Sequence, residues 1–200
     1  MIQNQAIISL KALIDQIPHR AGRIECYGLN GSERAFLIAR LYQQLRIPIF
    51  VVTPSTKLAE TLLEDLRFFK QSHDVPLYLL PSYNISPFKL MAYHNETAAQ
   101  RIRTLYQLLE SPIPPIVIAA AETLLQKIIP KREIINYAEL IMAEEEIDRE
   151  RLIEKLIAGG YTHAAIVEEP GDFCVRGGIM DIFCPLYPEP LRIEFFGDVA

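Results

Sequence analysis

The segment from Gly28 to Ala35, Gly-Leu-Asn-Gly-Ser-Glu-Arg-Ala, lies where a phosphate-binding loop would lie in an α/β protein. It follows a predicted strand at Arg23–Tyr27 and precedes a predicted helix at Ala35–Leu45. A working loop has the pattern G-x-x-x-x-G-K-[ST]. Its glycines let backbone amides surround the phosphates, its lysine reaches the β- and γ-phosphates, and its hydroxyl binds Mg²⁺. Gly28 is in register with the first glycine of this pattern.

Three later positions of the loop depart from the working pattern. Glu33 stands where the second glycine is required, Arg34 replaces the lysine, and Ala35 replaces the magnesium-binding residue. The added carboxylate and the lost metal ligand both oppose triphosphate binding, so we expect neither bound nucleotide nor ATPase activity here. Two interpretations stay open, an ordinary glycine-containing turn and a degenerate P-loop. The positions of the degenerate P-loop are Gly28, Gly31, Ser32, Glu33, Arg34 and Ala35.

The first part of the chain alternates predicted strands and helices around this loop. Short β-branched runs predict strands, and apolar residues at helical spacing predict helices. The continuous apolar run Ile47–Thr53 is expected to be a buried parallel strand. Together the elements predict a doubly wound α/β domain with a parallel sheet. The other predicted strands are Arg23–Tyr27, Leu77–Leu80 and Ile116–Ala119, and the predicted helices are Ile7–Ile17, Ala35–Leu45, Thr56–Phe69, Glu96–Leu109 and Ala121–Ile129.

The second part of the chain changes in both pattern and charge. One amphipathic helix, Arg149–Ala158, is followed by strands too closely spaced for crossover helices, so we expect mostly antiparallel pairing in a smaller α+β domain. Residues 1–125 carry 12 Lys and Arg against 10 Asp and Glu, whereas residues 126–200 carry 8 against 15. We therefore expect domains at 1–125 and 126–200, the second truncated at its C-terminal end. The predicted strands are Glu133–Tyr137, Ala164–Glu168, Phe173–Val175, Gly178–Phe183 and Leu191–Phe196.

Composition excludes several classes of protein. No apolar run reaches the roughly 18 residues of a membrane span, and the N-terminus lacks the features of a signal peptide. Three cysteines without metal-ligand spacing indicate reduced thiols in a cytoplasmic protein, and no metal site is expected. A net charge of −5 argues against strong nucleic-acid binding by this chain alone.

The stretch from Gly160 to Asp198, GYTHAAIVEEPGDFCVRGGIMDIFCPLYPEPLRIEFFGD, closely resembles the bacterial transcription-repair coupling factors. That family has the core G-Y-x-x-x-x-x-V-E-x-P-G-E-F-x-V-R-G-G-I-x-D-I-F, followed by P-x-R-I-E-F-F-G-D. Three other stretches fit the same family, so the resemblance covers about residues 24–200. They are Leu80-Pro-Ser-Tyr-Asn-Ile-Ser-Pro-Phe with the later Ala99-Gln-Arg, Ile116-Val-Ile, and Thr123-Leu-Leu-Gln.

The resemblance implies an architecture like that of the excinuclease component UvrB. It also implies that different parts of the full protein have different functions. It implies a RecA-like domain with a degenerate P-loop, then a smaller inserted domain that binds UvrA, another component of the same excinuclease. The full protein would bind RNA polymerase stalled at a lesion and displace it by DNA translocation, using ATP and Mg²⁺ in a distal motor module. This chain would then be non-catalytic and free of cofactors, and would meet RNA polymerase and DNA only through other parts of the protein.

The alternative is a fragment of UvrB itself or of another nucleotide-dependent, helicase-like DNA enzyme. UvrB has an intact P-loop and a tyrosine-rich β-hairpin that inserts into DNA. In this chain the loop is broken, and the stretch Tyr83–Gln100 is too short for the hairpin. Both departures favour the coupling factor.

Arg176 matches the family position that contacts UvrA. An arginine beside two glycines on a strand edge is open to a partner, and its guanidinium binds a carboxylate through two hydrogen bonds. The alternative is a surface ion pair with Glu168 or Glu169. Phe173 and Phe183 lie near Arg176 in the sequence, and aromatic residues are frequent interface anchors, although core packing is the other interpretation for each.

This chain differs from the related families at Thr162-His163 and at Cys174. The coupling factors usually have an additional arginine after the residue that matches Tyr161, and this chain has Thr162-His163 there. We expect His163 to be a weaker cationic substitute for that arginine. Cys174 stands where UvrB has a basic residue, and Asp181 is expected to form structural hydrogen bonds at a strand end.

Overall fold

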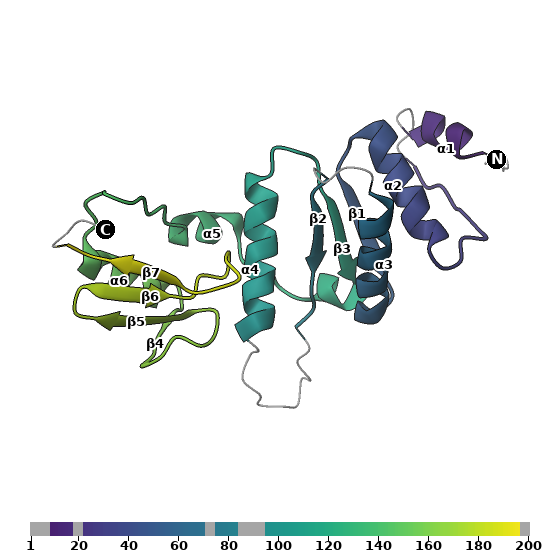
Figure 1. Ribbon diagram of the computed structural model, residues 1–200. Coiled ribbons are helices and arrows are strands. Elements are labelled where there is room, and N and C mark those ends of the chain that lie inside the picture. Colours follow the sequence, from purple (N-terminus) through teal and green to yellow (C-terminus); the bar gives the residue numbers. More distant parts are fainter. Residues whose placement is uncertain (1–8, 18–21, 71–74, 84–94, 197–200) are drawn as a thin grey trace. The chain divides into compact units, whose positions relative to one another are not determined.

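The computed structural model describes residues 9–17, 22–70, 75–83 and 95–196 (Figure 1). The chain divides into two compact units, which are built from interleaved stretches of sequence. Unit 1 contains Met1–Leu80 and Ser111–Leu124, and unit 2 contains Pro81–Glu110 and Leu125–Ala200. The domains expected from the sequence, 1–125 and 126–200, stay a prediction about independently folding parts. None of the helices in the described ranges has the length and hydrophobicity of a membrane span.

Unit 1 contains a three-stranded sheet in which all strands are parallel, as predicted. Strand β3 (Ile116–Ala120) lies between β1 (Ile49–Thr53) and β2 (Leu77–Leu80). In this register Ile118 is opposite Val51 on one side and Leu79 on the other. All five residues of β3, the central strand, are buried.

Two helices cover one face of the parallel sheet. Helices α2 (Glu33–Leu45) and α3 (Thr56–Phe69) pack apolar side chains against β1, β2 and β3. Helix α3 begins after Ser55, whose hydroxyl accepts a hydrogen bond from the Leu58 amide at 3.4 Å, as expected of a cap. A further short helix, α1 (Leu10–Gln16), precedes them.

Two sequence predictions for unit 1 are wrong. Residues 22–30 contain no strand: Arg23 and Glu25 form an ion pair with each other at 2.8 Å, and Tyr27 is 84% exposed. The two charged side chains pair with each other at the solvent-exposed surface, and the segment is not paired with a strand of the sheet. Strand β1 is also only half-buried, because its other face exposes Phe50 and Val52.

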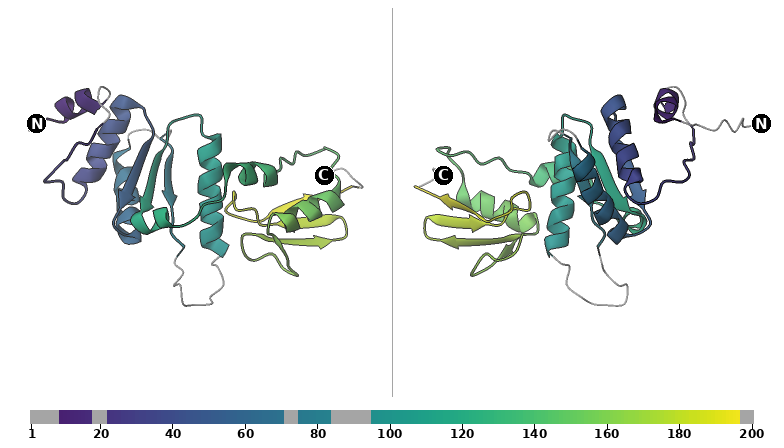
Figure 2. Two further views of the ribbon diagram at one scale, coloured as in Figure 1. Left: turned by 180° about the vertical axis from the view of Figure 1, so that it is seen from behind. Right: turned by 45° about the vertical axis from the view of Figure 1, so that its right-hand side comes forward.

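Unit 2 contains a mixed four-stranded sheet with strands in the order β4-β5-β6-β7. Strand β4 is parallel to β5, and the other neighbours are antiparallel, so the expected antiparallel character is confirmed. Helix α6 lies on one face of the sheet (Figure 2). The buried Phe173 and Met180 belong to the core that forms there. The elements are β4 (Thr162–His163), β5 (Asp172–Arg176), β6 (Ile179–Ile182), β7 (Leu191–Glu194) and α6 (Arg149–Ala158).

Three predicted elements of the later sequence differ from the structure. The run expected as a strand at Glu133–Tyr137 is part of helix α5 (Lys131–Tyr137), which starts directly after Pro130. Proline has a backbone angle suited to a helix start, and this local effect outweighs the β-branched residues. The helix expected at Ala121–Ile129 is a short 3₁₀ turn, η2 (Ala121–Leu125), and Ala164–Glu168 is a loop.

Helix α4 (Asn95–Glu110) is tied to the rest of unit 2 by polar side chains. Arg101, only 2% exposed, donates to the Pro81 carbonyl and lies 4.3 Å from the ring centre of Tyr83. Arg103 donates to the carbonyl of Pro185 at 2.6 Å and to that of Tyr187 at 3.0 Å. These bonds join α4 to residues more than 80 positions later in the chain. Most of the stretch Tyr83–Gln100 that precedes them, residues 84–94, lies outside the described residues.

Candidate protein-binding site

The face of the mixed sheet opposite α6 carries charged side chains. Side chains alternate along a strand, so the residues between the buried positions of β5, β6 and β7 point away from α6. We call this surface the open face. The register places the residues in two rows across the strands. One row is Cys174, Asp181 and Arg192, and the other is Arg176, Ile179 and Glu194.

Asp181 and Arg192 form a two-pronged ion pair on the open face. Arg192 Nε donates to Asp181 Oδ1 at 2.7 Å, and Nη2 donates to Oδ2 at 2.9 Å. The hydrogen bond from Arg192 lowers the pKa of Asp181 below its ordinary value, with smaller contributions from the positive charges of Arg192 and Arg176. The open face therefore has two guanidinium groups close to one ionised carboxylate.

The residues between β4 and β5 form a surface loop that hydrogen bonds fix to the sheet. We call it the 164–171 loop. At its start the Ala164 amide donates to the Phe173 carbonyl at 2.9 Å. At its end Asp172 Oδ2 accepts from the amides of Glu168 at 3.3 Å and Glu169 at 3.0 Å. The loop is therefore held by hydrogen bonds at both ends.

The middle of the 164–171 loop is bonded to the open face. The carbonyl of Ala165 accepts from the Arg176 guanidinium and from Cys174 Sγ, the latter at 3.5 Å. Cys174 is buried, at 5% exposed. The next loop residue, Ile166, is 65% exposed.

Arg176 is exposed, as the sequence predicts, and it is held in place by the Ala165 carbonyl. Among the ion pairs of the described residues, none joins Arg176 to Glu168 or Glu169. A guanidinium has five N–H donors, so most of its hydrogen-bonding capacity is available to a partner. Its role as a contact residue stays a prediction.

The other predicted contact residues differ in how far they are exposed to solvent. Phe173 is 1% exposed and packs in the core under α6, so it is a core residue and not a surface anchor. Phe183 is half-buried, and its backbone continues the pairing of β5 with β6 through the carbonyl of Asp172. Thr162 and His163 are exposed on β4, and the His163 ring lies 5.1 Å from that of Phe173.

Sequence reasoning missed two features of this site. The Asp181–Arg192 pair depends on a strand register that no single strand reveals, although opposite charges on neighbouring predicted strands are a usable signal. The exposure of Ile166 depends on the path of the 164–171 loop, part of which the sequence predicts as a strand. An isoleucine in a strand would be assigned to the core.

The loop before α2 has a different character. Gly28 and Gly31 adopt left-handed backbone angles, with φ of 81° and 61°. Arg34 Nε donates to the Leu29 carbonyl at 3.1 Å, so this cation is bonded to its own loop. Glu33 occupies the first turn of α2, and Ala35 is completely buried in the core.

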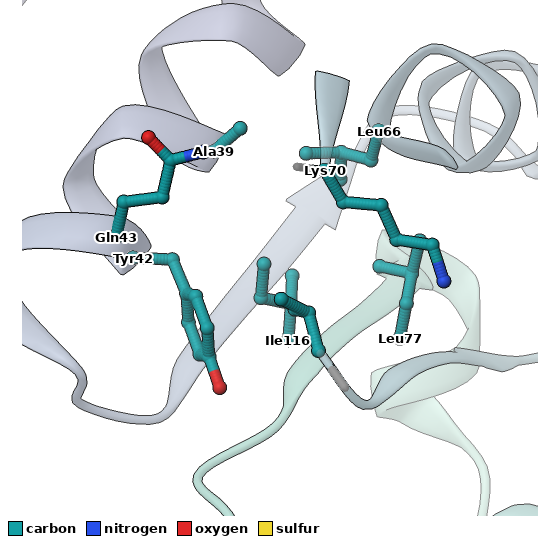
Figure 3. Close-up of a pocket in the computed structure, with 8 residues that line it drawn as sticks. Ala39, Tyr42, Gln43, Leu66, Lys70, Leu77 and Ile116 are labelled. Carbon is teal, nitrogen blue, oxygen red and sulfur yellow. The ribbon is translucent and has the colours of Figure 1, made fainter. Parts of the chain in front are cut away.

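The core of unit 1 contains a small cavity. A cavity of about 10 Å³ between α2, α3 and the sheet is lined by Tyr42, Leu66 and Ile116 among others (Figure 3). One water-sized probe fills such a volume. Across the described ranges, no group of three or more His, Cys, Asp and Glu side chains is placed to hold a metal ion.

Unit 2 is therefore an α+β domain whose mixed sheet has one helix-covered face and one polar face. Residues 140–199 match the family model of the UvrB interaction domain. The matched residues include Arg176, the Asp181–Arg192 pair and the 164–171 loop.

The chain is similar to proteins named transcription-repair-coupling factor along most of its length. It is 32% identical to the one from Myxococcus xanthus over 191 residues, which is 93% of this chain and 16% of the relative. Identity is 29% with the one from Bacillus subtilis, over 84% of this chain and 14% of the relative. Identity is 27% with the one from Escherichia coli, over 91% of this chain and 16% of the relative. The family resemblance found in the sequence is confirmed, and the chain spans about a sixth of the length of these relatives.

Proposed function

We propose that this chain is the UvrB-like part of a transcription-repair coupling factor and that it binds the excinuclease component UvrA. In the full-length protein it would recruit UvrA to RNA polymerase stalled at a DNA lesion, in the cytoplasm. Displacement of the polymerase by ATP- and Mg²⁺-dependent DNA translocation would belong to the parts of the relatives that this chain does not match.

One observation carries the proposal: an exposed, fixed arginine on the open face of a UvrB interaction domain. Arg176 stands on β5, a central strand of the mixed sheet, so its backbone is held by hydrogen bonds to β6. Its guanidinium is held by the Ala165 carbonyl before any partner arrives. A preorganised guanidinium loses little freedom when it binds a carboxylate, which favours a specific protein contact.

The test is a calorimetric titration of purified UvrA with the wild-type chain and with Arg176→Ala. We expect the substitution to weaken binding by about tenfold or more, and Arg176→Glu to weaken it further through charge repulsion. Arg132→Ala is the matched control, because this arginine of α5 has an 81% exposed side chain and lies outside the matched family residues. Wild-type affinity in Arg176→Glu would contradict the proposal.

We also propose that unit 1 is a RecA-like domain whose degenerate P-loop binds no nucleotide, so that the chain is non-catalytic and needs no cofactor. Glu33 adds negative charge at the start of α2, and the Arg34 guanidinium is bonded to Leu29. The buried Ala35 has no hydroxyl for a magnesium ion. These three features support the proposal, because a triphosphate needs glycine, lysine and hydroxyl at these places.

Titration with a fluorescent ATP analogue and Mg²⁺ tests this second part. We expect no saturable binding by the chain at concentrations that saturate an intact P-loop protein measured in parallel. Saturable, magnesium-dependent binding would instead support the alternative of a nucleotide-dependent DNA enzyme similar to UvrB.

A further inference from the structure

Ile166 is a large apolar side chain that the 164–171 loop presents to solvent. Its 65% exposure contrasts with the burial of the strand that the loop is bonded to, where Cys174 is 5% exposed and Phe173 is 1% exposed. Single exposed apolar residues are common on protein surfaces. Exposure alone therefore carries no conclusion about Ile166.

The support of the 164–171 loop distinguishes Ile166 from other exposed apolar residues. The loop is bonded near both ends through Phe173 and Asp172, and in its middle through Arg176. Asn95 of α4 adds a bond from its amide to Glu169 Oε2 at 2.8 Å. The main cost of using a loop as a contact surface is the conformational freedom that the loop loses on binding. A loop fixed at this many points loses little.

The position of Ile166 in the chain places it directly beside the proposed contact. Arg176 donates to the carbonyl of Ala165, the residue immediately before Ile166. A positive charge and an apolar side chain therefore lie next to each other on one rigid surface. Interface centres commonly combine an apolar anchor with a guanidinium group, and Arg is enriched there.

We propose that Ile166 is the apolar anchor of the surface that binds UvrA, and that Arg176 has two roles, contacting the partner and holding the 164–171 loop. This inference rests on the proposed function. The occupant is a patch of UvrA with an apolar depression for Ile166 and a carboxylate beside it for Arg176. A carboxylate is the group that the Arg176 guanidinium can bind through two hydrogen bonds. Ile166 and Arg176 both lie within residues 140–199, which match the UvrB interaction domain.

The first test measures the affinity of UvrA for Ile166→Ala and Ile166→Asp by calorimetry. We expect about a tenfold loss for Ile166→Ala, from the apolar area no longer buried, and a larger loss for Ile166→Asp. Ile157→Asp is the matched control and should bind like wild type, because Ile157 is 57% exposed on α6, the helix that covers the opposite face. Circular dichroism and thermal unfolding verify that each variant is folded.

The outcomes separate this inference from the proposed function. If the wild-type chain does not bind UvrA, the proposed function fails. If wild type binds and Arg176→Glu does not, but both Ile166 variants keep wild-type affinity, only the role of Ile166 is overturned.

A double-mutant cycle tests the second role of Arg176. If Arg176 holds the loop, Arg176→Ala already displaces Ile166, so combining it with Ile166→Ala costs less than the sum of the two single losses. Fully additive losses would overturn the holding role. Arg176→Lys supplies a second measurement: it keeps the charge but loses the guanidinium geometry, and we expect an intermediate affinity.

Discussion

In the parallel sheet the central strand β3 is buried at all five positions, whereas β5 and β6 of the mixed sheet combine buried residues with charged ones that are only partly buried or exposed. In β3 the side chains are apolar on both sides, from Ile116 to Ala120. In the mixed sheet one face packs against α6, and the other carries Arg176, Asp181, Arg192 and Glu194.

The difference shows how two sheets in one chain can serve different purposes. Burial of both sides of β3 stabilises unit 1 but leaves this strand no side chain for a partner. The mixed sheet obtains its stability from one face and keeps the other for charged groups. Four substitutions, taken from the largest expected effect to the smallest, test this contrast.

Phe173→Ala should have the largest effect on stability. Phe173 is the most buried aromatic residue of the α6 face, and its truncation leaves a cavity in the core, so we expect a loss of about 3–5 kcal/mol in the free energy of unfolding. Urea denaturation followed by circular dichroism measures it. Phe196→Ala is the control, because Phe196 is 81% exposed and should cost less than about 0.5 kcal/mol. Equal losses for both variants would contradict the assigned core.

Ile118→Ala should destabilise the parallel sheet somewhat less, by about 2–5 kcal/mol, because fewer atoms are removed from a completely buried site. The same denaturation experiment applies. Ile24→Ala serves as the control, since Ile24 is 42% exposed in the segment without regular structure. A loss for Ile118→Ala no larger than that of the control would show that β3 is not the centre of this core.

Ser55→Ala should remove the cap of α3 at a cost of about 1 kcal/mol. The Ser55 hydroxyl accepts from the Leu58 amide, and alanine leaves that amide to solvent. Ser55→Asp is the matched control, because its carboxylate restores the acceptor. The prediction fails if the aspartate variant unfolds at the same urea concentration as the alanine variant.

Asp181→Asn should have the smallest effect, and one that depends on pH. The folded pKa of Asp181 is lowered by Arg192, so its stabilising contribution is present at neutral pH and is lost as pH falls below about 4 through the folded pKa. Solvent screens the pair, since Arg192 is 59% exposed. The urea midpoints of wild type and variant should differ more at pH 7 than at pH 3. Arg192→Gln should remove this pH dependence, and an unchanged difference in that background would contradict the assignment.

Much of the fold is predictable from local sequence because the signals are strong. Ser55 followed by regularly spaced leucines specifies α3, and the β-branched runs of β1 and β3 specify strands. Two of the wrong predictions have a clear physical reason. Arg23–Tyr27 has alternating residues but its charges pair with each other, and Glu133–Tyr137 has β-branched residues but follows a helix-initiating Pro130.

The candidate site is only partly predictable. Arg176 follows from the family motif, and its exposure agrees with the two glycines that follow it. The Asp181–Arg192 pair requires the register of β6 and β7, which are joined by a proline-containing loop whose path no local pattern specifies. The exposure of Ile166 requires the hydrogen bonds of Ala165 and Asp172, which connect residues through the fold and leave no periodic trace in the sequence.

The interleaving of the two units has a practical consequence for fragment design. Unit 2 draws on two separate stretches of chain, and helix α4 belongs to the earlier one. A truncated clone starting at residue 126 would omit Asn95 and Arg103, and with them the donors that satisfy Glu169, Pro185 and Tyr187. To express unit 2 by itself, a clone should therefore start near residue 81. The alternative is to supply its two stretches, Pro81–Glu110 and Leu125–Ala200, together.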